Sequence, residues 1–145
     1  MFDIFIKFDF VKNHVFLTLS PQNMSEKKKI VLAEDNSVLS LLLKFRLEKD
    51  GYHLLIAKNG KEALELIETE NPDLILTDVM MDYVSGLEVI SHVRNQLKSK
   101  TPILVFSSSG QEEMVLNAFN LGANDFMGKP LSPNELSIRV KRMLL

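Results

Sequence analysis

The sequence contains no cysteine among its 145 residues. The chain therefore forms no disulfide, holds no metal through thiolates and has no thiol nucleophile, which fits a reducing compartment. Its three histidines, His14, His53 and His92, are scattered along the chain and do not indicate a shared catalytic or metal site. No apolar run is long enough to span a bilayer, and the amino terminus lacks the cationic start and the cleavage site of a secretory signal. We expect a cytoplasmic protein with no membrane partner.

The chain also has little excess charge of either sign. A net charge of −2 and a pI of about 5.9 give no basic surface of the kind that attracts a phosphate backbone, so we expect no direct contact with nucleic acid. Hydrophobic residues make up 46% of the sequence and charged residues 25%. This composition is typical of one globular domain with enough apolar surface to bury a core.

The first residues differ in composition from the rest of the chain. Five of the nine phenylalanines precede residue 17, and apolar residues alternate with mainly polar ones, which is typical of an edge strand or a hairpin. The segment "SPQN" then resembles a linker, and "MSEKKK" from Met24 onward resembles an ordinary bacterial protein start. We interpret residues 1–23 as an upstream extension with no role in the function. Residues 1–25 then form an extension and linker, non-native or disordered, and residues 26–145 form the functional domain.

From Lys29 onward, short apolar runs alternate with helical patterns. This alternation predicts a doubly wound α/β fold, with a five-stranded parallel sheet and helices on both faces. We expect strands at residues 29–34, 52–57, 73–77, 103–107 and 125–128. Each predicted helix carries one apolar stripe that we expect to be buried. The five stripes are Val38, Leu41, Leu42 and Phe45; Ala63, Leu64 and Ile67; Leu87, Ile90, Val93 and Leu97; Val115, Ala118, Phe119 and Gly122; and Leu136, Val140, Met143 and Leu144.

Polar residues follow the predicted strands at one edge of this sheet. In such folds, ligands bind at the carboxyl ends of the strands, where the strand order reverses. The residues that we expect there are Glu34, Asp35, Asp78, Ser107 and Lys129. Each alone has another explanation, because Asp35 can cap a helix, Ser107 can belong to a turn and Lys129 can be a solvated lysine. Chance does not explain why all five fall at the same edge.

The chemistry of this set is specific. Three carboxylates at one edge repel each other and resist ionisation unless a cation lies among them. Oxygen ligands without histidine or cysteine favour Mg²⁺. A metal beside a carboxylate, a lysine and a small hydroxyl is typical of a phosphoryl-transfer site, and an aspartate can itself hold an acyl phosphate. The pattern predicts a Mg²⁺ site built from Glu34, Asp35 and Asp78.

At these residues the sequence resembles a receiver domain of the bacterial response regulators, which act in two-component phosphorelays. The resemblance covers residues 28–144 and depends on "AEDN", "LILTDVMM" with a later "SG", "PILVFSSSG" and "FMGKP", in this order. It implies a flavodoxin-like sheet with strand order 2-1-3-4-5. It also implies a phosphoacceptor signalling domain, which is not a conventional enzyme but assists its own phosphotransfer and autodephosphorylation. One departure is Asp82, which stands where many members have proline.

The resemblance assigns roles at the acidic edge. Glu34 and Asp35 would hold Mg²⁺ together with Asp78 and the backbone carbonyl of Met80. Asp78 would accept a phosphoryl group from a phosphohistidine. This role explains why an apolar strand ends on an aspartate.

The resemblance assigns further roles on the last two strands. Ser107 would donate its hydroxyl to a phosphoryl oxygen and act as part of a switch, and Lys129 would pair with the phosphoryl group. The Lys129–Pro130 bond is expected to be cis, a state readily open only to X-Pro bonds. Phe126 matches the aromatic switch position, which turns inward when the hydroxyl moves toward the phosphoryl group.

Partners are also implied by the resemblance. The phosphodonor would be a sensor histidine kinase or a histidine phosphotransfer protein, and a downstream protein would bind the face formed by the fourth helix, fifth strand and fifth helix of the domain. Because the chain ends at Leu145, we expect a stand-alone regulator of the chemotaxis or relay type. The alternative is a receiver from a longer DNA-binding transcriptional regulator.

Two other classes fit the residues less well. An aspartyl phosphatase of the haloacid dehalogenase type needs a second acid two residues after its nucleophile, and Met80 stands there. A flavin or nucleotide binder would have glycines and hydroxyls after the first strand, where this chain has Glu34 and Asp35. A receiver that works unphosphorylated, as a binding module alone, would not need the full set of acids, hydroxyl and lysine.

Overall fold

The computed structural model describes residues 4–11, 14–21 and 27–145. Strands β1 (Ile4–Val11) and β2 (His14–Pro21) pair antiparallel as a two-stranded sheet, so the alternating pattern forms a hairpin. The predicted extension, residues 1–25, lies partly outside the described residues. Its origin and its lack of a role in the function stay predictions.

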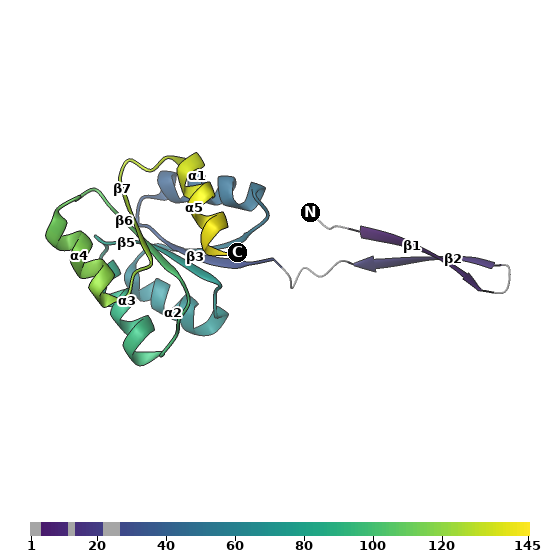
Figure 1. The fold of residues 1–145 in the computed structure, drawn as a ribbon, viewed down its shortest axis with the longest axis horizontal. Helices are drawn as coiled ribbons and strands as arrows, with labels where there is room; N and C mark the ends of the chain where they lie inside the picture. Colours follow the sequence, from purple (N-terminus) through teal and green to yellow (C-terminus); the bar gives the residue numbers. More distant parts are fainter. Residues whose placement is uncertain (1–3, 12–13, 22–26) are drawn as a thin grey trace.

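The five strands of residues 27–145 form one parallel sheet (Figure 1). They are β3 (Lys29–Ala33), β4 (His53–Ala57), β5 (Leu74–Asp78), β6 (Ile103–Ser107) and β7 (Asp125–Gly128). Their order is β4-β3-β5-β6-β7, and every neighbouring pair is parallel. In chain order from β3 this is 2-1-3-4-5, which confirms the predicted doubly wound, flavodoxin-like fold. The order reverses at β3, which lies between β4 and β5.

Within residues 27–145, five α-helices cover the two faces of the sheet. They are α1 (Ser37–Lys49), α2 (Gly60–Glu70), α3 (Gly86–Ser91), α4 (Glu112–Leu121) and α5 (Pro133–Met143). Figure 1 shows α1 and α5 on one face and α2, α3 and α4 on the other. The third predicted helix consists of α3 and a π-helix, His92–Gln96, that continues it. Among the described residues, no helix has both the length and the apolar character needed to cross a membrane.

The central strands are buried on both faces, so the domain has two apolar cores. Alternate residues of a strand point to opposite faces of a sheet. On β3, Val31 and Ala33 lie in the core beneath α2, α3 and α4, whereas Ile30 and Leu32 lie in the core beneath α1 and α5. Phe106 of β6 belongs to this second core and is fully buried. These two cores fix the carboxyl ends of β3, β5 and β6 relative to one another.

The start of α1 decides between two explanations of Asp35. The N-cap of α1 is Asn36, whose side chain accepts a hydrogen bond from the Leu39 N–H at 3.0 Å. The backbone N–H of Asn36 in turn donates to Glu34 at 3.0 Å. Asp35 therefore does not cap the helix. Its side chain is exposed and can take part in a site at the carboxyl edge of the sheet.

The buried stripe predicted for the first helix is wrong. Val38, Leu41, Leu42 and Phe45 are 77%, 62%, 50% and 71% exposed, while Leu43 and Leu47 face the core. The helix is apolar nearly all round, so periodicity alone does not determine which side is buried. Leu97 and Phe119 were also expected to be buried, but they are 37% and 43% exposed.

Candidate functional site

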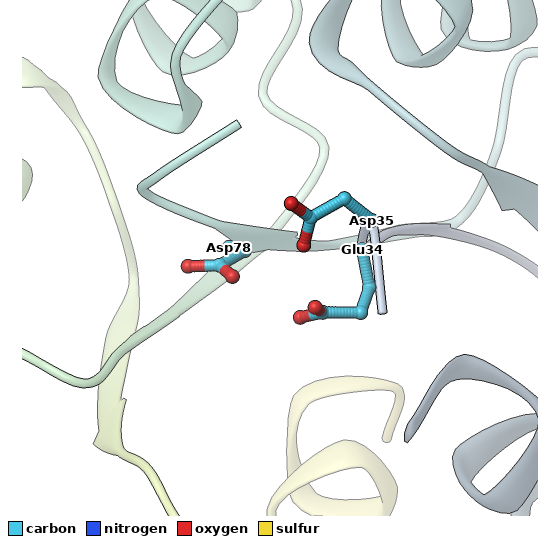
Figure 2. Close-up of side chains that lie close together, drawn as sticks. All are labelled: Glu34, Asp35 and Asp78. Atoms are coloured by element: carbon cyan, nitrogen blue, oxygen red, sulfur yellow. The ribbon is translucent and has the colours of Figure 1, made fainter. Parts of the chain in front are cut away.

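Three carboxylates meet at the carboxyl edge of the sheet. Glu34 and Asp35 follow directly after β3, and Asp78 is the last residue of β5. Because Ala33 pairs with Thr77 in parallel register, the ends of these strands lie side by side. One oxygen from each of the three side chains lies within 4.8 Å of the others (Figure 2). Glu34 and Asp78 are buried, and Asp35 is exposed.

Lys129 brings a positive charge to this cluster from the end of β7. Its Nζ lies 2.6 Å from Asp78 Oδ2 and 2.9 Å from Glu34 Oε2, and 5.5 Å from the centre of the Phe106 ring. Its backbone N–H donates to the Ser107 carbonyl at 2.8 Å. The following bond, Lys129–Pro130, is cis, as the resemblance implies. Lys129 is therefore not a freely solvated lysine, because it bridges two buried acids.

Burial and charge shift two pKa values in this cluster. Burial raises the pKa of the Glu34 carboxyl above its usual range, although the hydrogen bonds from Lys129 and from the Asn36 N–H act in the opposite direction. Burial alone would lower the pKa of the Lys129 ammonium, but its hydrogen bonds to Asp78 and Glu34 outweigh this effect and raise it. Lys129 therefore stays charged, and burial makes the ionised form of Glu34 less favourable than in water.

The raised pKa of Glu34 predicts a pH dependence of stability. Above the ordinary value of 4.5, the folded protein binds a proton at Glu34 more tightly than the unfolded chain does. The free energy of unfolding should then fall as pH rises from 4.5 through the raised pKa. Urea unfolding in EDTA should show a smaller fall for Glu34→Gln than for the unchanged protein. If the free energy of unfolding falls equally with pH in both proteins, Glu34 is not the group responsible.

The backbone around Asp78 holds the carboxylate in a narrow range of positions. Asp78 Oδ1 accepts a hydrogen bond from the Met80 N–H at 3.2 Å, and the Val79 N–H donates to the Phe106 carbonyl at 3.1 Å. The first residue of α3, Gly86, packs directly on this turn. A Cβ atom at Gly86 would lie 2.1 Å from the Asp78 carbonyl oxygen, so a larger residue does not fit. The Met80 side chain is exposed.

Ser107 lies at the end of β6, beside the acidic cluster, and is buried. Its Oγ accepts a hydrogen bond from the Ser109 N–H at 3.1 Å and donates to Met114 Sδ at 3.7 Å. The hydroxyl is thus engaged with its own loop and with α4. Phe126, on β7, is half-buried and packs against the core beneath α2, α3 and α4.

Glu34, Asp35, Asp78 and Lys129 are brought together directly, and Ser107 is joined to them through the Lys129 backbone. Gly86 belongs to the "SG" of the sequence motif, but no role was predicted for it, and Met114 lies in none of the motifs. A glycine eight residues after a strand-ending aspartate is a signal for Gly86, since the following helix must start close to that strand. No sequence signal marks Met114, because its contact with Ser107 depends on how α4 lies on the sheet.

Comparison with known proteins assigns the family. The model of the response regulator receiver domain matches residues 30–141. The chain belongs to the response regulator receiver family. This membership confirms the resemblance and the predicted place in two-component signalling. Receiver domains of this kind are phosphorylated by histidine kinases and in general bind Mg²⁺ at an acidic pocket.

Curated relatives of this receiver domain are longer proteins. It is 42% identical over 117 residues to the alkaline phosphatase synthesis transcriptional regulatory protein PhoP of Bacillus subtilis, covering 81% of this chain and 48% of that protein. It is 39% identical over 116 residues to the transcriptional regulatory protein CrdR of Helicobacter pylori, covering 80% of this chain and 54% of that protein. The chain spans about half the length of the curated relatives it matches.

Solved structures of receiver domains share the fold along most of their length. The receiver domain of a Francisella response regulator is similar with a TM-score of 0.76 and 31% identity, covering 81% of this chain and 97% of that one. The chemotaxis response regulator CheY4 of Vibrio cholerae is similar with a TM-score of 0.76 and 28% identity, covering 81% of this chain and 99% of that one. The receiver domain is thus similar both to parts of longer regulators and to a chemotaxis response regulator.

Proposed function

We propose that Asp78 of this receiver domain accepts a phosphoryl group from a phosphohistidine in a Mg²⁺-dependent reaction. The observation that carries the proposal is the pair of contacts from Lys129 Nζ to Asp78 and Glu34, beside the exposed Asp35. Three carboxylates and one ammonium leave two net negative charges at one edge. Such an edge favours a divalent cation and disfavours direct binding of phosphate.

The residues at this edge fit Mg²⁺. Glu34, Asp35 and Asp78 supply only oxygen atoms, which is the ligand chemistry that this ion prefers, and the backbone carbonyl of Met80 is a further candidate. When bound, Mg²⁺ would neutralise the cluster and stabilise negative charge on a transferring phosphoryl group. The half-exposed arrangement, with Glu34 and Asp78 buried and Asp35 exposed, leaves room for a phosphodonor.

Each side chain of the site has a separate role in the phosphoryl transfer. A carboxylate oxygen of Asp78 attacks phosphorus, the bond from phosphorus to the donor histidine nitrogen breaks, and that nitrogen keeps the electron pair. Lys129 holds Asp78 in place beforehand and then pairs with the phosphoryl oxygens. Ser107 donates its hydroxyl to a phosphoryl oxygen, and Phe126 turns inward as this hydroxyl moves. The same groups assist transfer to water, which returns the domain to its unphosphorylated form.

We further propose that the signal leaves the domain through α4, β7 and α5. Large apolar side chains are exposed on these helices, Leu116 and Phe119 on α4 and Ile138 on α5, and they suit a protein partner. Of the two proposed switch residues, Phe126 lies on β7, and Ser107 ends the neighbouring strand β6 and contacts Met114 of α4. A shift in their positions therefore reaches this surface through direct packing.

Two forms of the whole protein fit this function. In one, the receiver domain acts alone on a partner protein or in a relay. In the other, it is part of a longer transcriptional regulator, which the names and lengths of PhoP and CrdR favour. Those names conflict in part with the expectation of no nucleic-acid contact, so we limit that expectation to the receiver domain itself. We propose a cytoplasmic location in both cases, since a cysteine-free chain fits a reducing compartment.

Acetyl phosphate tests the acceptor directly, without a partner protein. With Mg²⁺ present, we expect the intact mass of the chain to increase by one phosphoryl group, and peptide mapping to place it on Asp78. Asp78→Asn should abolish the increase, because an amide does not form the acyl phosphate. EDTA, or Asp35→Asn, should slow it strongly. A phosphoryl group found elsewhere, or an increase that persists in Asp78→Asn, would overturn the proposal.

The exposed apolar face of α1 predicts where the phosphodonor binds. Val38, Leu41, Leu42 and Phe45 lie on the helix that starts directly after Glu34 and Asp35, so a helical partner on this face would place its histidine near Asp78. Phe45→Asp should slow transfer from the phosphorylated kinase domain that transfers fastest in a profile of the sensor kinases of the source organism. We expect a loss of at least tenfold, since a charge replaces a contact near the centre of the interface.

This prediction has two controls, phosphorylation by acetyl phosphate and the same substitution at a second phenylalanine, Phe119. Phosphorylation of Phe45→Asp by acetyl phosphate should match that of the unchanged protein, because the small donor needs no docking surface. Phe119→Asp introduces the same charge on α4, on the opposite face of the sheet, and should leave transfer from the kinase within about twofold. An equal loss in both variants would show that α1 is not the docking helix.

A further inference from the structure

The single proton of the Ser107 hydroxyl is already in use in the unphosphorylated domain. A serine hydroxyl has one proton to donate. Here it is directed at Met114 Sδ, 3.7 Å from Ser107 Oγ, while the same oxygen accepts the Ser109 N–H at 3.1 Å. If Ser107 is to donate to a phosphoryl oxygen on Asp78, it must first leave Met114. The contact therefore opposes the step that the proposed function requires.

The start of α4, where Met114 lies, differs from the starts of the other helices of residues 27–145. Met114 lies in the first turn of α4, whose N-cap residue, Gln111, makes no side-chain capping bond. The other four α-helices of residues 27–145 are each capped by a side chain, from Asn36, Asn59, Ser85 and Ser132. The buried residue of α4 is Ala118, in the second half of the helix. The hydrogen bond from Ser107 to the Met114 sulfur thus links the first turn of α4 to the end of β6.

We infer that Met114 is a positioning residue that holds the Ser107 hydroxyl in its unphosphorylated orientation and couples this hydroxyl to the first turn of α4. A thioether is a weak acceptor, whereas a phosphoryl oxygen is charged and accepts a stronger hydrogen bond. Phosphorylation of Asp78 therefore draws the proton away from Met114. The first turn of α4 then loses its bond to β6 and is free to move. The inference rests on the proposed function of Asp78 and Ser107.

The test uses the full chain with Mg²⁺ and beryllofluoride, which binds an aspartate in place of a phosphoryl group. Met114→Leu keeps the apolar volume but removes the acceptor, so the unliganded state loses a weak hydrogen bond. We expect beryllofluoride to bind about two- to fivefold more tightly, as measured by ¹⁹F NMR titration. The Ser109 amide resonance of the unliganded protein should also shift, because Ser107 Oγ, its acceptor, is released. Met143→Leu, the same change on α5, should alter neither quantity.

A double-mutant cycle separates this role from simple packing. With Ser107→Ala as the background, Met114→Leu should no longer change the beryllofluoride affinity, because there is no hydroxyl to release. Unchanged or weaker binding by Met114→Leu would overturn the inference, and so would an equal gain in the Ser107→Ala background. If the unchanged protein fails to bind beryllofluoride with Mg²⁺, the proposed function itself is wrong. If it binds and Met114→Leu has no effect, only the role of Met114 is wrong.

Discussion

Lys129→Met is expected to lower the free energy of unfolding by about 3–5 kcal/mol at neutral pH in EDTA, because it removes one partner of a buried charge cluster. The side chains of Glu34 and Asp78 are 0% and 6% exposed, and both are hydrogen-bonded to Lys129 Nζ. Methionine has similar length but no charge, so two carboxylates would remain buried beside each other. Urea unfolding followed by circular dichroism measures the loss. Added Mg²⁺ should recover part of it.

A surface lysine provides the control for this change. Lys44, on α1, pairs with Glu48 at 3.7 Å, and both side chains are well exposed. Lys44→Met should cost less than about 1 kcal/mol, as is usual for exposed ion pairs. If Lys129→Met is no more destabilising than Lys44→Met, the two buried acids do not depend on Lys129. Lys129→Met, but not Lys44→Met, should also lose most of its reaction with acetyl phosphate, since Lys129 positions Asp78.

Gly86→Ala is expected to destabilise the domain by about 3 kcal/mol or more, because the added Cβ meets backbone atoms rather than a flexible side chain. It would lie 2.1 Å from the Asp78 carbonyl oxygen and 2.9 Å from Val79 Cα. Either α3 or the end of β5 must shift, and the second of these displaces the acceptor carboxylate. The expected result is a lower midpoint of urea unfolding together with slower phosphorylation by acetyl phosphate.

Gly110 is a matched control for Gly86. A Cβ atom there would meet no atom within 4 Å. Gly110→Ala should be neutral or stabilise the domain by up to about 1 kcal/mol, because it reduces the freedom of the unfolded chain. A cost for Gly86→Ala that is no larger than that of Gly110→Ala would contradict the close packing of α3 on Asp78.

Most of the fold could be predicted from the sequence, because it follows from local alternation. The strands Ile103–Ser107 and Asp125–Gly128 have the bounds that the sequence predicts. β3 and β4 each differ by one residue at one end, and β5 differs by one residue at both ends and includes Asp78. At these ends apolar runs pass gradually into polar ones. The residues of the candidate site were found by the same rule, since the carboxyl ends of parallel strands share one edge.

What the sequence could not determine is how the helices rotate on the sheet. α1 is apolar nearly all round, so two sides of it could face the core, and the structure places Leu43 and Leu47 inside and Phe45 outside. Leu43 and Leu47 share this core with Leu136 and Val140 of α5, a contact between elements far apart in the sequence. The sequence pattern alone pointed to the other side.

The sequence by itself determined the class of the protein and the set of reactive groups: a parallel sheet with Glu34, Asp35, Asp78, Ser107 and Lys129 at its carboxyl edge. Only the tertiary structure decided how these groups are engaged, with Lys129 on two acids and Ser107 on Met114. The reason is physical. Strand periodicity is a local property that survives in the sequence, whereas a hydrogen bond between side chains of different elements depends on distances that arise only when both cores are packed.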